Sequence, residues 1–341
     1  QIRNQEENIT RQRELLLIFE DSLIELLTTI PESQRIVLQR LQVAQTRQTL
    51  TNALDTLASQ QASFQLSVDQ FLRTLGLPPY ICVELDDPIL SQFELIDQRL
   101  LRRREELSIL RSNVGELNIS ILEQTEFKID EDTGLPVSQI EWTPQLAESL
   151  EKLEAELEPL EQFLRDLIKI DLPKVAQDIV ELEEAIPVRK NQAESLKALY
   201  KAEQGSICGL LNVADIDESI FDTSKLESVL ADLIDDRQQL EDRLVKYLKK
   251  LNELQKSFKA IQDSAPGSVN PQELARQLRD TVILASQDLV ADLGDDVLVL
   301  QLLQAQARTE SVVLPEVNIT PEIAFEIARR NRRDYVFIRD R

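Results

Sequence analysis

The sequence contains no histidine and no methionine, and its 341 residues include only seven glycines and two cysteines. The absence of histidine excludes a His-bearing catalytic triad, a zinc site of the HExxH kind and a histidine proton switch. Aromatic residues make up 4% of the chain. Leu, Glu, Gln, Ala, Arg and Asp dominate, and this composition favours long helices over sheets. We therefore expect an extended helical protein rather than globular enzyme domains.

Acidic residues outnumber basic ones by 61 to 38, which gives a formal net charge of −23. Nucleic-acid binding depends on Lys and Arg displacing counterions from phosphates, so this balance argues against a DNA or RNA partner. No run of 18 apolar residues predicts a transmembrane helix, and the sequence shows neither a signal peptide nor an initiator Met. We therefore expect the chain to be a piece of a longer protein. One basic stretch near the end has helical spacing, so we expect its arginines to pair with acidic neighbours: Arg329, Arg330, Arg332, Arg333, Arg339 and Arg341.

The two cysteines lie far apart in dissimilar contexts. Cys82 follows Pro78-Pro79, whereas Cys208 lies between Ile207 and Gly209. Neither belongs to a CxxC pair, so we favour two free thiols over the alternative, a long-range disulfide formed in an oxidising compartment.

The first 76 residues predict two helices joined by a sharp turn. Residues 2–27 contain no helix breaker, and Pro31 then interrupts the pattern within residues 28–33. A second helix is predicted over residues 34–75 and stops at Gly76. Its apolar residues recur every seven positions and predict a seam against a partner helix: Ile36, Val43, Leu50, Leu57, Phe64 and Phe71, with Leu54 and Val68 between them.

Two further seams follow the alternating four-and-three spacing of a coiled coil. Thr143 caps the first of these helices, Pro144 occupies its first position, and Pro159 predicts a kink or a helix join. The first seam is Leu146, Leu150, Leu153, Leu157, Leu160, Leu164 and Leu167. The second follows a capping box at Ser224 and Glu227 and consists of Leu226, Leu230, Leu233, Arg237, Leu240, Leu244, Tyr247, Leu251, Leu254 and Phe258.

We interpret the two seams as antiparallel partners in one hairpin that reverses within residues 204–223. The alternative is that each seam packs on some other helix. Arg237 interrupts the second seam, and we expect it to fix the register or to bond a facing acid.

The remaining segments contain shorter signals. A helix is expected from near Leu90 to Gln124, and residues 127–142 predict a small hairpin or a loop. From Asp130 the acids partly follow a calcium-loop pattern, but Leu135 stands where that loop requires Gly, so we favour a solvated turn. Residues 264–268 predict a break, a helix then begins at Asn270-Pro271, and the helical pattern resumes after Gly294.

Together these signals predict an all-α fold of long helical hairpins and antiparallel coiled coil, with few or no strands. We expect a long hairpin over residues 1–88 and a helix-and-loop connector over residues 89–142. A coiled-coil insertion follows over residues 143–263, then a helical segment with an extended link over residues 264–319. A last helix begins within residues 320–341.

Two separated stretches, which cover about a fifth of the chain, resemble the TolC-type outer-membrane efflux channel family. The first resembles the end of that family's first structural repeat and runs from Val43-Ala44-Gln45 through Asp69-Gln70-Phe71-Leu72 to Leu75-Gly76-Leu77-Pro78-Pro79 and Glu84-Leu85-Asp86-Asp87. The second is similar to the helix that opens a repeat and consists of Thr320-Pro321-Glu322-Ile323-Ala324, Ala328, Asn331-Arg332-Arg333-Asp334 and Arg339.

The resemblance implies the periplasmic helical part of a trimeric efflux or export channel, with the outer membrane reached through segments outside this fragment. A periplasmic adaptor and an inner-membrane pump are the implied partners, in a Gram-negative-type bacterium. The turn at Thr29, Ile30, Pro31 and Ser33 corresponds to the tunnel tip that meets the adaptor, although the family commonly has a Gly there. The material between residues 90 and 314 is longer than the family's usual connection.

The alternative function is a coiled-coil scaffold or tether unrelated to transport. We do not expect an enzyme, because the abundant carboxylates have the spacing of solvated helix faces. We predict no catalytic residue, no cofactor and no metal site.

Overall fold

A computed structural model describes residues 2–28, 33–78, 94–129, 136–203, 223–268, 270–313, 323 and 325–326. It confirms the predicted all-α class. Long helices make up most of these residues, and a two-stranded antiparallel sheet accompanies them.

The chain begins with a helical hairpin, α1 (Ile2–Thr28) and α2 (Ser33–Thr74). The buried side chains at the turn end of this hairpin include Leu23, Ile24 and Leu27 of α1 and Val43 of α2. The predicted seam of α2 is packed only there: Phe64 and Phe71 are 60% and 58% exposed. Within the single chain α1 covers this seam only in part, because α1 is the shorter helix and its Gln5 already lies opposite Ala53; a partner for the rest of the seam stays a prediction.

Gly76 ends α2 as predicted. Its φ of 73° is in the left-handed region, where a residue without Cβ is favoured. The amide of Leu77 donates to the carbonyl of Leu72 at 2.9 Å, and the amide of Gly76 donates to that of Arg73 at 3.0 Å. This is the Schellman arrangement, which satisfies two carbonyls that the helix end would otherwise leave free.

Helix α4 (Gln98–Leu122) packs against α1 and leads into a small hairpin. It begins at Gln98 rather than near Leu90, because the side chain of Asp97 accepts from the amide of Arg99 and caps it there. Strands β1 (Glu126–Ile129) and β2 (Pro136–Gln139) pair with Glu126 opposite Gln139. The hairpin alternative was therefore the right one, while the acidic turn between the strands lies outside the described residues.

The next three helices form one interrupted rod, α5 (Pro144–Leu157), α6 (Leu160–Asp166) and α7 (Leu172–Glu203). Thr143 caps α5 by accepting from the amide of Leu146, with Pro144 at the first position, and Pro159 lies at the join between α5 and α6, as predicted. A π-helical turn, η1 (Leu167–Asp171), joins α6 to α7. All seven leucines of the first seam are buried, with exposures of at most 2%.

The last described rods are α8 (Ser224–Ser268) and the series α9 (Pro271–Gln277), η4 (Leu278–Ile283, π-helical) and α10 (Leu284–Ser311). The predicted break at residues 264–268 was wrong, because α8 continues to Ser268. The expected interruption before Gly294 was also wrong. Gly294 lies inside α10, and a Cβ added there would lie at an ordinary contact distance, 4.0 Å, from the Arg111 side chain of α4.

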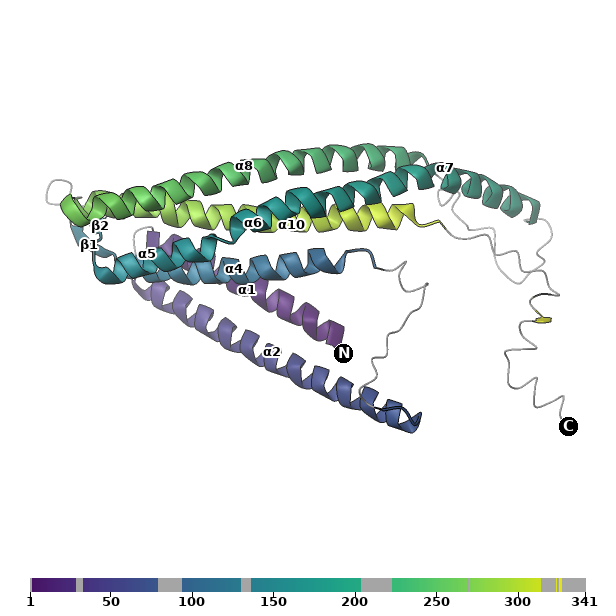
Figure 1. Ribbon diagram of the computed structural model, residues 1–341, viewed down its shortest axis with the longest axis horizontal. Helices are drawn as coiled ribbons and strands as arrows, with labels where there is room; N and C mark the ends of the chain where they lie inside the picture. The colour runs from purple at the N-terminus through teal and green to yellow at the C-terminus, as the bar shows by residue number, and fades with distance from the viewer. Residues whose placement is uncertain are drawn as a thin grey trace.

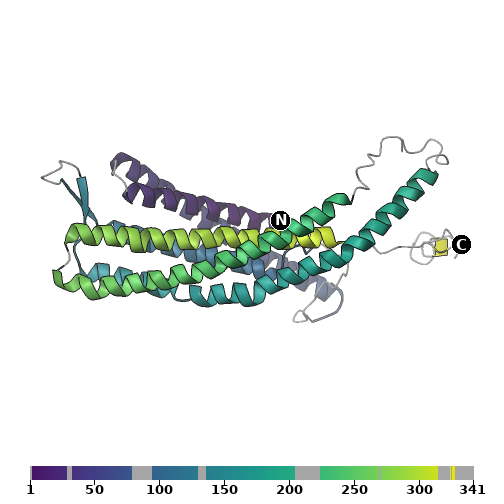
Figure 2. The ribbon, with the colours of Figure 1, turned by 90° about the horizontal axis from the view of Figure 1, so that it is seen from above.

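These rods form an elongated bundle in which the chain direction alternates from α4 to α5–α7, α8 and α9–α10 (Figures 1 and 2). The two predicted seams do meet, because α8 packs antiparallel on the α5–α7 rod, and α10 packs on both as well. The α1–α2 hairpin attaches to the bundle through α4 (Figure 1). One hydrophobic cluster extends from Leu16 and Leu23 to Ala307 through these rods. The domain boundaries drawn from the sequence stay predictions.

Candidate functional site

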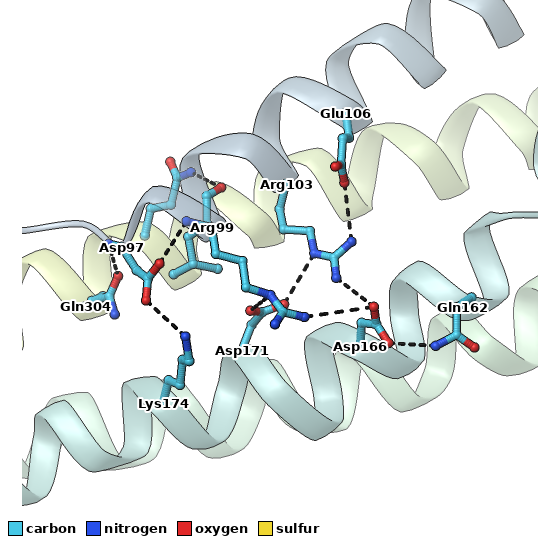
Figure 3. A network of polar contacts seen from close by, with 11 residues as sticks. Asp97, Arg99, Arg103, Glu106, Gln162, Asp166, Asp171, Lys174 and Gln304 are labelled. Carbon is cyan, nitrogen blue, oxygen red and sulfur yellow. Dashed lines mark hydrogen bonds and ion pairs between the residues drawn. The ribbon is translucent and has the colours of Figure 1, made fainter. Parts of the chain in front are cut away.

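The most developed polar cluster of the described chain lies where the start of α4 crosses the η1 turn (Figure 3). The seam of α5 and α6 spaces its leucines by three and four residues, and the next seam position after Leu167 is Asp171. The π-helical turn adds one residue here, so the apolar core resumes at Leu172 and Val175. Pro173 lacks an amide hydrogen and follows the turn, which fits a place where the regular hydrogen-bond ladder is interrupted. Both Asp171 and Leu172 are buried as a result.

Two arginines of α4 meet this buried carboxylate. Arg99 Nε lies 2.9 Å from Asp171 Oδ1, and Arg103 Nε lies 3.5 Å from Oδ2. Arg103 also donates to Asp166 Oδ2 at 2.7 Å, and its guanidinium lies 5.1 Å from the centre of the Phe163 ring. Neither Asp171 oxygen accepts a hydrogen bond of good geometry, so charge rather than directed bonding holds it.

A second arm of the network begins at Asp97. Its Oδ2 lies 3.2 Å from Lys174 Nζ on α7, and its backbone amide donates to Gln304 Oε1 on α10 at 2.7 Å. Gln304 in turn donates to Asp178 Oδ2 at 2.7 Å, and Arg308 Nε lies 3.0 Å from Asp178 Oδ1. The network therefore ties three rods, α4, α7 and α10, at one level of the bundle (Figure 3).

The carboxyl groups of the network have different electrostatic environments. Burial raises the pKa of Asp171, and Arg99 and Arg103 oppose this only in part. The pKa of Asp97 is lowered, mainly because its carboxylate accepts from the Arg99 amide, and Lys174 lowers it further. Hydrogen bonds from Arg103 and Gln162 lower the pKa of Asp166. Of these three carboxyl groups, Asp171 is the one whose pKa is raised.

An open groove of about 510 Å³ lies beside the second arm, and Asp97, Lys174, Asp178 and Arg308 line it together with Glu94, Gln177, Glu181, Ser311, Val312 and Val313. Lys174 pairs with Asp97 and Arg308 pairs with Asp178 in this lining. Such paired side chains fix the relative positions of helices, and the lining offers no nucleophile beside a free base. In the part of the chain that the structure describes, no group of three or more Cys, Asp or Glu residues is placed to hold a metal ion.

Smaller polar clusters elsewhere also pair a buried acid with an arginine of another helix. Glu20 of α1 is 1% exposed and pairs with Arg47 of α2 at 2.7 Å, and its pKa is raised by burial. Asp296 of α10 accepts from the Tyr247 hydroxyl at 2.8 Å and pairs with Arg243 at 2.9 Å. Each cluster joins an acid on one helix to an arginine on another.

The partner-contact turn predicted from the sequence is separate from this network. Thr29, Ile30 and Pro31 lie outside the described residues, and Ser33 opens α2. Cys82, Cys208 and the arginines from Arg329 onward also lie outside them. The network was not predicted from the sequence, although a signal was present: Asp171 is the acid at the next seam position after seven successive leucines. Arg237, the polar residue of the second seam, pairs with Glu241 of its own helix at 3.3 Å rather than with a facing acid.

No helix within the described ranges is long and apolar enough to cross a membrane. No family model matches the chain, and neither a curated protein nor a solved structure matches it.

Proposed function

We propose that this chain is the helical, non-catalytic part of an outer-membrane efflux or export channel protein. In this proposal the α1–α2 hairpin packs laterally against other copies in a trimer, and the α4–α10 bundle is an attached accessory module. One observation carries the proposal: α2 has apolar and uncharged side chains on faces that are exposed in the single chain.

Charge is scarce along the whole of α2. Six of its 42 residues are charged, whereas 16 of the 45 residues of α8 are charged. Residues 56–68 of α2 contain no charged side chain, and most of them are exposed. The core of a protein interface is depleted in charged residues in the same way, whereas a solvent-facing helix carries them on its outer face.

The exposed apolar residues of α2 lie on two faces. One set continues the seam that packs on α1 and includes Leu54, Phe64 and Phe71. The other lies near the start of the helix on its outer side and includes Val37 and Leu41, 67% and 52% exposed. A helix that buries two opposite faces fits a wall of laterally packed helices, which is the arrangement implied by the resemblance to the TolC-type family.

The partners and the location follow from the same proposal. The turn at Thr29, Ile30, Pro31 and Ser33 contacts a periplasmic adaptor that works with an inner-membrane pump. The chain lies in the periplasm of a Gram-negative-type bacterium, and the parent protein reaches the outer membrane.

The first test measures the mass of the chain in solution for the double variant Phe64→Glu and Phe71→Glu. In about 0.5 M salt, which screens exposed ion pairs, we expect the unaltered chain to form an oligomer and the variant to be a monomer with unchanged helix content. The matched control, Val180→Glu and Leu196→Glu, places the same charges on α7 at positions 50% and 56% exposed and leaves the oligomer intact. An unaltered chain that stays monomeric at high concentration contradicts lateral packing. Fractionation of the parent protein tests the location, and a parent found away from the outer membrane rejects the channel.

A coiled-coil scaffold or tether is the second candidate, and the bundle itself favours it. The leucines from Leu146 to Leu167 and the seam of α8 are buried within one chain, as expected of a rigid spacer. A parent that stays soluble, together with charged α2 variants that retain the mass of the unaltered chain, supports the tether over the channel.

A further inference from the structure

The outer face of α8 carries an ordered stripe of charge. The core of this helix is formed by Leu240, Leu244, Tyr247 and Leu251. The positions furthest from that core recur every seven residues, and four successive ones are Asp235, Asp242, Lys249 and Lys256. All four side chains are exposed. Figure 1 shows α8 along the upper edge of the molecule, on the opposite side from α2, so this face points away from the rest of the chain.

These four charges lack ion-pair partners among the residues that the structure describes. Asp235 accepts a hydrogen bond from the amide of Gln239, which is neutral. The neighbouring charges that turn toward the bundle are paired: Arg243 with Asp296 at 2.9 Å, and Lys250 with Asp292 at 3.1 Å. Other exposed charges of α8, such as Lys246 and Glu253, also have no ion pair among the described residues, so the stripe is distinguished by the order of its charges.

The four charged positions of the stripe are symmetric about its midpoint, and the charges on the two sides have opposite signs. Asp235 and Asp242 precede its midpoint at the same spacing at which Lys256 and Lys249 follow it. The midpoint lies between Val245 and Lys246, and Val245 is an exposed apolar residue there. The helix dipole does not account for this order, because it acts on the first and last turns and the stripe lies well inside a 45-residue helix.

We propose that two copies of the chain associate through this stripe, with α8 against α8 in antiparallel orientation. A two-fold axis at the midpoint places Asp242 of each copy opposite Lys249 of the other, and Asp235 opposite Lys256. Such an interface is isologous, because one surface meets an identical surface. The stripe spans about 32 Å at 1.5 Å per residue. Val245 of each copy lies on one side of the axis, where the two valines meet, and Lys246 lies on the other side, where two like charges meet and weaken the association.

This association is weak and sensitive to salt, because exposed ion pairs each contribute little and are screened. It uses a different helix from the lateral packing proposed for α2, so the two contacts are independent of each other. Together they allow one assembly to be joined to another.

The test is a charge exchange, measured by sedimentation equilibrium of the full chain. All proteins carry Phe64→Glu and Phe71→Glu, so that α2 does not contribute. One variant adds Lys249→Glu and Lys256→Glu, which makes the stripe acidic, and a second adds Asp235→Lys and Asp242→Lys, which makes it basic. We expect the unexchanged stripe to dimerise at low salt and each exchanged variant to associate at least about tenfold more weakly, since like charges oppose each other. An equimolar mixture of the two variants regains the dimer.

A matched control places two charge reversals elsewhere. Arg102→Glu and Lys169→Glu lie on α4 and η1, are exposed, and change the net charge as much as the acidic variant does. They leave the dimer unchanged. A mixture that associates no better than its components overturns the proposal, and so does an unexchanged stripe that shows no dimer at about 50 mM salt, where screening is weak.

Cross-linking tests the antiparallel geometry separately, with Cys82 and Cys208 replaced by Ser. Val245→Cys lies beside the axis, so we expect a short thiol cross-linker to join two copies readily. Lys256→Cys lies about 32 Å from its equivalent when 1.5 Å per residue is counted across the axis, so it does not cross-link. Equal cross-linking at both positions rejects the antiparallel arrangement.

Discussion

Arg103 is expected to stabilise the contact between α4 and the η1 turn more than any exposed ion pair on the same rods. Replacement by Met keeps the length and the apolar stem of the side chain but removes four interactions. These are the 2.7 Å bond to Asp166, the 3.3 Å pair with Glu106, the 3.5 Å approach to Asp171 and the contact with the Phe163 ring. Asp171 is 1% exposed and then keeps Arg99 as its single close arginine.

The size of the effect follows from these four losses. The pairs with Asp166 and Glu106 contribute little because solvent screens them, and a cation–π contact adds about 0.5–1 kcal/mol. The larger loss is at Asp171, but it has an upper limit because the carboxyl can take up a proton instead. From an ordinary pKa of about 3.9, protonation at pH 7 costs about 4 kcal/mol at 1.4 kcal/mol per pH unit, and burial already reduces this figure. We expect a total of about 2–4 kcal/mol in the free energy of unfolding.

Urea unfolding followed by far-ultraviolet circular dichroism measures this loss. Arg165→Met is the matched control, because Arg165 pairs with Glu161 at 2.6 Å on the exposed face of α6, and we expect it to cost less than about 0.5 kcal/mol. The cost of Arg103→Met should shrink between pH 7 and pH 5, since protonation of Asp171 removes the unpaired charge. A cost equal to that of Arg165→Met, or a cost independent of pH, refutes the assignment of Asp171 as a buried charge that depends on Arg103.

Three further predictions concern the core, the pH dependence and the end of α2. Leu164→Ala removes a seam leucine with no exposed surface and should cost about 2–5 kcal/mol in urea unfolding, while Leu196→Ala, at a position 56% exposed, should stay within about 0.5 kcal/mol. Burial raises the pKa of Glu20 and Asp171 above their unfolded values, so the folded state binds more protons than the unfolded one and stability should increase as pH falls from 7 toward 5. The double variant Glu20→Gln and Asp171→Asn should flatten this dependence of stability on pH. Below about pH 4 stability should fall instead, because Asp97 and Asp166, whose pKa values are lowered in the folded state, then take up protons. Gly76→Ala forces a Cβ into the left-handed region and should cost about 1–2 kcal/mol, seen as faster hydrogen exchange at the Leu77 amide, and an unchanged exchange rate contradicts the Schellman stop.

The parts of the fold that were predictable are those controlled by local chemistry. Three helix ends are fixed by local backbone angles and nearby amides, so their positions could be inferred without the fold. They lie at Thr143 with Pro144, at Asn270 with Pro271, and at Gly76. The leucines from Leu146 to Leu167 were predictable for a related reason, since a repeat of three and four residues keeps one face of a helix toward a partner.

The remaining features depend on contacts between distant segments. The sequence alone did not show that Gly294 faces Arg111 or that α8 continues to Ser268. It also did not show that α1 covers only the first part of α2, because the length of a contact depends on both helices. The network was missed because its members come from α4, α10 and the rod formed by α6, η1 and α7, and Arg103 and Asp166 are more than 60 residues apart in the sequence.

The η1 turn connects these local and long-range features. If α6 continued into α7 as a regular helix, the seam after Leu167 would place Asp171, Lys174, Asp178 and Glu181 toward the core. The extra residue moves Leu172, Val175, Ile179 and Leu182 into the core instead, and all four are buried. Asp171, Lys174 and Asp178 are then left on the side that faces α4 and α10, where Arg99, Asp97 and Arg308 meet them. Because the α1–α2 hairpin is attached to the bundle through α4, the register set at this one turn also sets how the hairpin is held. Deleting one residue within η1, such as Lys169, should therefore leave a regular helix in which Leu172 and Val175 stay in the core, because they then follow Leu167 at the seam spacing, and only the pairing of Asp171 with its arginines on α4 should change. Hydrogen exchange that rises at the start of α4 but not in α5 or α7 is the expected result, and a rise along the whole of α7 contradicts this account of the turn.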